Sequence, residues 1–157
     1  MPKQKMMDLL HELIIDCKRS DRELANVLHA SQHTITRMRK NLENSGFIRE
    51  YTIMPSLEKM GFEIVAMNFL SIMHGQEPIK EIQKWASENN SVILASHGEG
   101  LAGKTVMLVS VHKDFTDFSA FSHALKDFLG PKMSSTQSFL FSLRAGVLKD
   151  FSFRNLE

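Results

Sequence analysis

Residues 31–44 read SQHTITRMRKNLEN, and this stretch decides how the first part of the chain folds. Ser31 is a favourable helix N-cap, because its hydroxyl can accept a hydrogen bond from a backbone N–H in the first turn. Ile35, Met38 and Leu42 follow at helical spacing and form one apolar stripe. The opposite face carries side chains that can hydrogen-bond base edges or phosphates: His33, Thr36, Arg37, Lys40 and Asn41. The stretch therefore predicts an amphipathic helix whose outer face suits contact with nucleic acid.

The residues before this helix predict a second, shorter helix. Ser20 and Glu23 have the spacing of a capping box, so a helix is expected over residues 21–28. A turn at residues 29 and 30 then leads to the next helix. Two short helices joined by a tight turn are the plan of a helix-turn-helix, in which the second helix enters the major groove. An ordinary helical hairpin would show the same pattern, and the basic outer face favours the helix-turn-helix.

The flanking segments complete the expected N-terminal domain. A first helix is expected over residues 3–17, with Cys17 as a small buried side chain on its inner face. Residues 47–53 alternate apolar and polar, which predicts a strand. This strand would be the wing of a winged helix-turn-helix, with Arg49 and Tyr51 able to touch the sugar-phosphate backbone. A solvated strand face is the alternative interpretation of these two side chains.

Three stretches together resemble a known family: SDRELA (20–25), ASQHTITRMRKNLENSGFIREYT (30–52) and PSLEKMG (55–61). They are similar to the N-terminal domain of the Lrp/AsnC ("feast/famine") transcriptional regulators, and the resemblance implies sequence-specific binding of double-stranded DNA. One departure lies in the turn, where the family usually has glycine and this chain has His29. Histidine visits positive φ more often than most residues, so we expect the turn to survive with some strain.

The helix over residues 31–44 supplies most of the candidate DNA contacts, because the N-terminal end of such a helix usually reaches the bases. The expected DNA-binding residues are Gln32, His33, Thr34, Thr36, Arg37, Lys40, Asn41 and Arg49. Of these, Lys40, Asn41 and Arg49 are expected to hold phosphates. Arg39 is left open, because its helical angle allows it either to flank the core or to reach a phosphate.

The remaining two thirds of the chain alternate between strand-like and helix-like segments. Strands are expected over residues 63–73, 91–96, 105–112 and 138–143, and helices over residues 78–89 and from Asp114 or Asp117 to Gly130. The order β-α-β-β-α-β is that of a ferredoxin-like domain, one antiparallel sheet with two helices on one face. The chain is therefore expected to be α+β: a winged helix-turn-helix over 1–54, a linker over 55–62, and a ferredoxin-like domain for dimerisation and effector binding over 63–157.

The strand over residues 63–73 is apolar on both sides, which indicates a sheet covered by helices on one face and by something else on the other. We expect the open face to carry Ile64 and Leu70. A homodimer joined sheet to sheet is the simplest cover for such a face. The resemblance implies the same, because Lrp/AsnC proteins dimerise through this domain and often assemble further, into octamers.

Residues 97–105, HGEGLAGKT, match the P-loop pattern G-x-x-x-x-G-K-T. Phosphate binding by a P-loop needs a helix directly after the loop, and the apolar, β-branched run that follows here predicts a strand instead. In the Lrp/AsnC family this connection lines a small-molecule effector pocket, usually with a T-G-x-x-D motif whose Asp is missing here. The resemblance implies that Gly98, Gly100 and Gly103 would offer backbone N–H groups to a ligand carboxylate, and that Glu99 would meet an amine.

Composition and charge limit the other functions. Net charge is +1, but residues 1–54 hold nine Lys/Arg against seven acids, so DNA binding would be local and helped by dimerisation. The single cysteine, the lack of a long apolar run and the absence of a signal-peptide pattern favour a cytoplasmic protein without membrane contact. No cofactor or metal site is expected.

Two alternatives to a regulator remain. Sirohaem decarboxylases resemble Lrp/AsnC proteins in both halves and would make the chain an enzyme. They carry a His-Asn-Tyr motif that is missing here, so we expect no enzymatic activity. A ligand sensor on the same fold, without DNA binding, is the other alternative.

Overall fold

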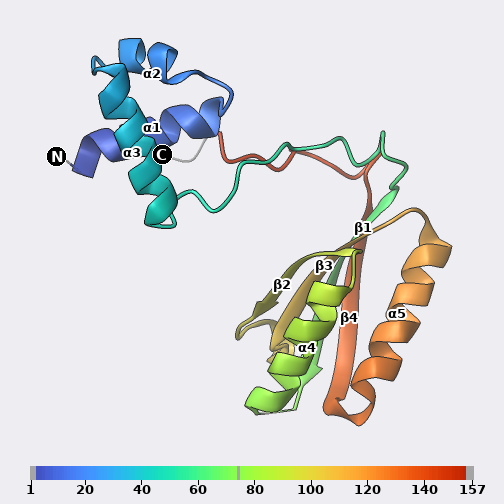
Figure 1. Cartoon of the computed structure of the whole chain (residues 1–157). Coiled ribbons are helices and arrows are strands. Elements are labelled where there is room, and N and C mark those ends of the chain that lie inside the picture. Colours follow the sequence, from blue (N-terminus) through green and yellow to red (C-terminus); the bar gives the residue numbers. More distant parts are fainter. Residues whose placement is uncertain (1–2, 74, 155–157) are drawn as a thin grey trace. The chain divides into compact units, whose positions relative to one another are not determined.

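The computed structural model describes residues 3–73 and 75–154. The chain divides into two compact units. One runs to Met54 and takes in the segment from Lys149, and the other is Pro55–Leu148. The elements, labelled in Figure 1, are α1 (Lys3–Ile15), α2 (Asp21–Val27), α3 (Gln32–Asn44), β1 (Ile64–Ile72), α4 (Gln76–Glu88), β2 (Val92–His97), β3 (Val106–His112), α5 (Phe115–Leu129) and β4 (Met133–Ser142).

The first unit is built from three helices around one apolar core. The predicted stripe of α3 is confirmed, because Ile35, Met38 and Leu42 are all fully buried. They pack against the buried face of α2 and against α1, with Leu9, Leu13, Leu24 and Ala25 completing the core. Burial of apolar side chains at about 25 cal/mol per Å² is the main force that holds such short helices together.

Two expectations for the first unit are wrong. Cys17 is exposed rather than buried, because α1 ends at Ile15 and Cys17 lies past its last turn. Residues 47–53 do not form a strand, so the unit has no wing. Alternation alone does not make a strand: a ladder needs a hydrogen-bonded neighbour, and no described segment pairs with these residues. Phe47 and Ile53 are accordingly exposed.

The second unit contains a four-stranded sheet in the order β2-β3-β1-β4, with every neighbouring pair antiparallel. Together with α4 and α5 this is the predicted ferredoxin-like arrangement. The last strand begins at Met133, five residues earlier than expected. The polar residues between Met133 and Phe139 also pair with β1, because the ladder is formed by the backbone and does not require apolar side chains. Among residues 3–73 and 75–154 no helix has the length and apolar character needed to span a membrane.

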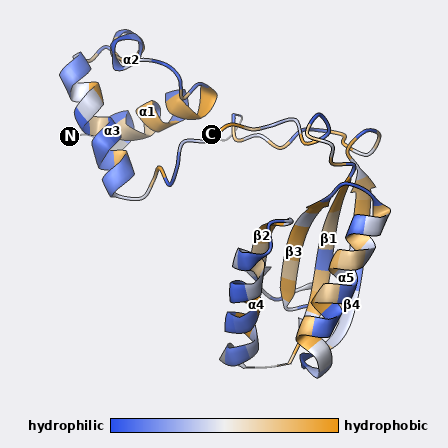
Figure 2. Ribbon diagram, turned by 45° about the vertical axis from the view of Figure 1, so that its right-hand side comes forward, coloured by the Kyte–Doolittle hydropathy of each residue, from blue (hydrophilic) through white to orange (hydrophobic). Residues whose placement is uncertain are grey.

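Helices α4 and α5 cover one face of the sheet, as Figures 1 and 2 show. The core on that face includes Ala66 and Leu70 of β1, together with Ile82, Phe118 and Phe121 of the helices. The prediction that Leu70 and Ile64 mark the open face is therefore wrong, since alternate residues of β1 share one side. Both sides of this strand are apolar, so its sequence does not reveal which side faces the helices.

The opposite face of the sheet, called the open face below, carries the second apolar cluster. Val65, Val109 and Val111 are its buried members, and Leu57 and Phe62 from the connector pack against them. Other side chains of the cluster come from all three longer strands and from the segment after β4: Met67, Met107, Phe141 and Leu143. No helix in the described part of the chain covers this face, so its apolar side chains can contact another molecule.

Candidate nucleic-acid interface and loop pocket

Helix α3 begins with the predicted cap. Ser31 Oγ accepts a hydrogen bond from Thr34 N at 3.1 Å, and the two hydroxyls lie 2.9 Å apart. The capping box of α2 is also confirmed, with Ser20 N donating to Glu23 Oε2 at 2.7 Å and Ser20 Oγ accepting from Glu23 N. Such caps replace the missing intrahelical partners of the first N–H groups. Both helices of the helix-turn-helix therefore have defined starting points.

The turn between α2 and α3 contains His29 with φ +48°. This confirms that the position where the resembled family carries glycine has left-handed backbone geometry here. Ala30 N donates to Ala25 O at 3.0 Å, which closes the turn around it. Since a non-glycine residue in this region is strained, the packing of α2 on α3 must hold the turn in place.

An ion pair joins the two helices at their outer edge. Arg39 Nε donates to Asp21 Oδ1 at 2.9 Å, and the hydroxyl of Thr36 donates to Asp21 Oδ2 at 2.6 Å. Burial opposes ionisation of this carboxyl, but the hydrogen bonds from Thr36 and Arg39 hold the pKa of Asp21 below its ordinary value. Arg39 also donates to the Arg19 carbonyl, so it acts as a strut between α2 and α3. The helical angle of Arg39 left its role open, and the structure places its side chain at the contact between α2 and α3.

The outer face of α3 carries seven exposed polar side chains: Gln32, His33, Arg37, Lys40 and Asn41, with Glu43 and Asn44 at the C-terminal end. The two threonines differ from them, because Thr34 and Thr36 are only half exposed and their hydroxyls are engaged within the protein. Thr36 retains its methyl group and acceptor lone pairs for an outside partner. The structure thus brings together most of the side chains predicted to contact DNA on one continuous helix face.

The segment after α3 holds the last predicted DNA contact. Arg49 is exposed, and Tyr51, two residues further along the chain, donates a hydrogen bond to Glu43 Oε1 at 2.9 Å. This bond ties the segment to the C-terminal end of α3 in place of the predicted wing. The hydroxyl of Tyr51 is therefore bonded to α3. Arg49 adds an exposed positive charge after α3, on a segment that is not a strand.

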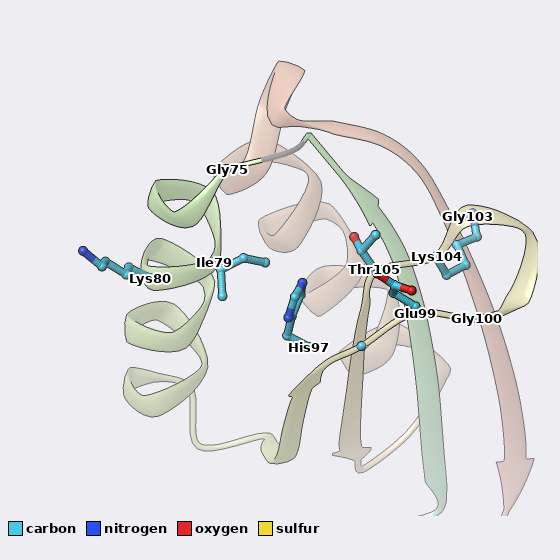
Figure 3. Close-up of a pocket in the computed structure, with 10 residues that line it drawn as sticks. Gly75, Ile79, Lys80, His97, Glu99, Gly100, Gly103, Lys104 and Thr105 are labelled. Atoms are coloured by element: carbon cyan, nitrogen blue, oxygen red, sulfur yellow. The ribbon is translucent and has the colours of Figure 1, made fainter.

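The glycine-rich connection between β2 and β3 forms a pocket of about 750 Å³ with the start of α4. The four predicted effector residues Gly98, Glu99, Gly100 and Gly103 all line it. So do six further residues: Gly75, Ile79, Lys80, His97, Lys104 and Thr105. In Figure 3, Ile79, His97 and Thr105 surround the hollow, whereas Lys80 points away from it.

The loop itself lacks the features of a nucleotide-binding P-loop. Gly98 N donates to Thr105 O at 3.0 Å, which closes the connection as a hairpin, and a strand follows at Val106. The prediction that a strand rather than a helix follows Lys104-Thr105 is confirmed. Positive φ values at Ala102 and Gly103 allow the tight return of the chain.

Sequence reasoning missed a chain of buried polar side chains beneath α5. Asn68 Nδ2 donates to Ser110 Oγ at 3.1 Å, and Ser110 Oγ lies 2.8 Å from His112 Nε2. His112 is fully buried between the rings of Phe118 and Phe121. Burial lowers the pKa of His112, against the attraction of a nearby Asp117 carboxylate. The only signals available were the two-residue spacing of Ser110 and His112 in β3 and the single Asn68 inside the apolar β1.

Comparison with known sequences gives one partial match. The chain is 32% identical over 84 residues to a protein of Pyrococcus furiosus described as an uncharacterized HTH-type transcriptional regulator. The match covers 54% of this chain and 55% of the relative, so the aligned part is about half the length of that relative. No protein-family model matches the chain.

Comparison with solved structures covers nearly the whole chain. An AsnC family transcriptional regulator from Agrobacterium tumefaciens has a TM-score of 0.82 at 18% identity, over 98% of this chain and 95% of its own. A transcriptional regulator of Neisseria meningitidis, solved in complex with L-Met, has a TM-score of 0.79 at 20% identity over the same shares. LrpC of B. subtilis has 0.77 at 16% identity, over 98% and 99%. The Lrp/AsnC resemblance is therefore confirmed in the fold.

Proposed function

We propose that this chain, which has the fold of the Lrp/AsnC regulators, is a cytoplasmic, sequence-specific DNA-binding transcriptional regulator that acts as a homodimer. The observation that carries the proposal is the outer face of α3. Gln32, His33, Arg37, Lys40 and Asn41 are exposed together on a capped helix, whose inner face is fully buried. An α-helix held in this way fits the major groove, where such side chains read bases and hold phosphates.

The proposal assigns two kinds of contact along α3. Side chains near its N-terminal end, with Arg37 as the main one, read base edges, because arginine can donate two hydrogen bonds to guanine. Lys40, Asn41 and Arg49 hold phosphates and fix the register. Since the net charge of the chain is only +1, two copies are needed to bind tightly at physiological salt.

An electrophoretic mobility-shift series with the full chain tests these roles. Arg37→Ala should relax base preference and cost about 1–3 kcal/mol at one position of the site, whereas Lys40→Ala should weaken all sequences alike and lower the salt slope by about one. Lys84→Ala is the matched control, because Lys84 is an exposed lysine on α4, outside the proposed interface. If both α3 variants bind as the control does, α3 is not the recognition helix.

The loop pocket gives the proposal a regulatory site. A small-molecule effector in this pocket would meet the backbone of Gly98, Gly100 and Gly103 and the carboxylate of Glu99. The fold neighbour from Neisseria meningitidis, solved with L-Met, supports a search among amino acids. Thermal unfolding in the presence of each amino acid is the direct test: a stabilising compound should lose its effect in Glu99→Gln if its amine binds there.

A further inference from the structure

Lys104 is the only buried lysine or arginine in residues 3–73 and 75–154, with 8% of its surface exposed. Its Nζ donates one hydrogen bond, to Ser135 Oγ at 2.6 Å. None of the ion pairs formed by the described part of the chain involves Lys104. Most of the lysine side chain is therefore buried, and its ammonium donates to the neutral hydroxyl of an exposed serine.

This arrangement leaves the charge poorly compensated. An ammonium group has three donors and no acceptor, and a single serine uses only one of them. Removing a charge from water costs several kcal/mol unless an opposite charge and further hydrogen bonds replace the solvent. The unused donors of Lys104 therefore suit an anionic partner.

The two serines beside Lys104 extend this row of hydrogen-bond donors. Ser135 Oγ receives the hydrogen bond from Lys104 and donates its own to Ser71 Oγ at 3.0 Å. Ser71 and Ser135 are paired across β1 and β4, so the two hydroxyls are fixed side by side. No described residue accepts the hydroxyl hydrogen of Ser71. The row thus ends in donors: two N–H groups of Lys104 and one O–H of Ser71.

The row formed by Lys104, Ser135 and Ser71 lies beside the loop pocket, but the Lys104 side chain does not point into that pocket. Lys104 borders that pocket, and Figure 3 shows its side chain on the opposite side of Thr105 from Ile79 and His97. Thr105 fixes the position of the loop end, because its Oγ1 accepts from Ile72 N at 3.1 Å and its N donates to Leu70 O at 2.8 Å. Lys104 is thus held next to β1 by backbone contacts of its neighbour.

We propose that Lys104, Ser135 and Ser71 form a binding site for a small oxyanion, the carboxylate or phosphate group of a small metabolite. Carboxylate and phosphate oxygens accept several charge-assisted hydrogen bonds at once, which is what the unused donors require. All three residues belong to the second unit, so the site does not depend on DNA binding.

Thermal unfolding of the full chain tests the site, with inorganic phosphate and acetate as separate probes and sodium chloride at matched ionic strength as the reference. We expect a saturable rise in Tm with one or both probes, of about 3–6 °C at ten times the dissociation constant. Lys104→Gln should abolish the rise and Ser71→Ala should reduce it. Lys84→Gln, on the exposed face of α4, should keep it.

A second variant separates the charge from the packing. Lys104→Met keeps the length of the side chain and removes the buried charge, so without added anion it should be at least as stable as the parent chain. Adding phosphate or acetate should then stabilise only the parent. If neither probe exceeds sodium chloride, or if Lys104→Gln responds as the parent does, the site does not exist. If the anions do nothing and Lys104→Gln weakens dimerisation about tenfold, a carboxylate of the second copy fills the site and the small-anion proposal is overturned.

Discussion

His29 holds the turn of the helix-turn-helix in a conformation that favours glycine, with φ +48° and an exposed side chain. Its imidazole contributes little packing, so the backbone strain dominates the effect of a substitution. We expect His29→Gly to stabilise the first unit by up to about 1 kcal/mol and His29→Val to destabilise it by about 1 kcal/mol or more. Urea unfolding followed by circular dichroism measures both. A loss of stability in His29→Gly would show that the side chain, not the backbone, matters.

His112 makes the second unit sensitive to acid. Its ring is buried in the neutral form, with the pKa lowered by burial, and Nδ1 has no hydrogen-bond partner among the described residues. The charged groups near it come from the start of α5: Asp117, whose Oδ2 lies 3.8 Å from Nδ1, and Lys113 and Asp114 next in the chain. As pH falls below about 6.5, His112 binds a proton in the unfolded chain but stays neutral in the folded chain, so the free energy of unfolding falls.

The pH dependence of unfolding checks this directly. Between pH 7 and pH 5 the parent chain should lose stability, and His112→Gln, which retains a hydrogen-bonding group beside Ser110, should lose less over the same range. Urea midpoints at several pH values give the comparison. Parallel pH profiles for the two proteins would mean that His112 does not titrate in this way.

The pairing of α2 with α3 depends on Asp21. Its two carboxylate oxygens take hydrogen bonds from Arg39 and Thr36, with the side chains of Asp21 and Arg39 about four fifths buried. Asp21→Ala should cost about 1–3 kcal/mol of stability, because it removes charge-assisted hydrogen bonds and leaves Arg39 unpaired. Since its pKa lies below 3.8 in the folded chain, this contribution is present above about pH 4 and is lost as pH falls further.

A comparison of two variants isolates this effect. Asp21→Ala should lower both the unfolding midpoint and the affinity for DNA, because the angle of α3 is no longer fixed. Glu50→Ala, an exposed acid in the segment after α3, removes the same charge without removing the strut and serves as control. Equal stability of the two variants at pH 7 would contradict the role of Asp21.

Local chemistry explains which elements could be predicted from the sequence. The caps at Ser20 and Ser31 and the apolar stripe of α3 follow from short-range spacing, and all of them are present. The failures involve information that is not local. A strand over residues 47–53 needs a partner segment, and the end of α1 at Ile15 leaves Cys17 outside the helix.

The candidate site shows the same division. The exposed face of α3 follows from helical periodicity, whereas the engagement of Thr36 by Asp21 depends on how two helices pack. The glycines of the loop could be assigned to one pocket because they lie within six residues of one another. The burial of Lys104 could not be predicted from local sequence, because its partner Ser135 is 31 residues away along the chain.

The open face of the sheet sets the expected assembly of the molecule. Val65, Val109 and Val111 form its buried centre, and Phe139, which pairs with Met67 on the same face, is 61% exposed in the single chain. A face-to-face homodimer would cover these side chains, and the linker residues packed beside them would then bring two copies of the first unit into one assembly.

A single charge on this face tests the dimer. Phe139→Asp should raise the dissociation constant of the dimer at least tenfold, because a carboxylate would be buried among apolar side chains. Light scattering coupled to size-exclusion chromatography measures the mass. Phe115→Asp is the matched control, since Phe115 is equally exposed but belongs to α5 on the other side of the sheet. If Phe139→Asp remains as dimeric as Phe115→Asp, the open face is not the interface.

The central claim is that α3 reads DNA as part of a dimer. Selection of bound fragments from genomic DNA with the purified full chain tests it most directly. The structure predicts enrichment of a pseudo-palindromic site, with half-sites spaced by one helical turn of about 10 bp or a multiple of it, and loss of that enrichment in the Arg37→Ala, Lys40→Ala double variant. Recovery of no common site, or of the same site with the double variant, would contradict the account.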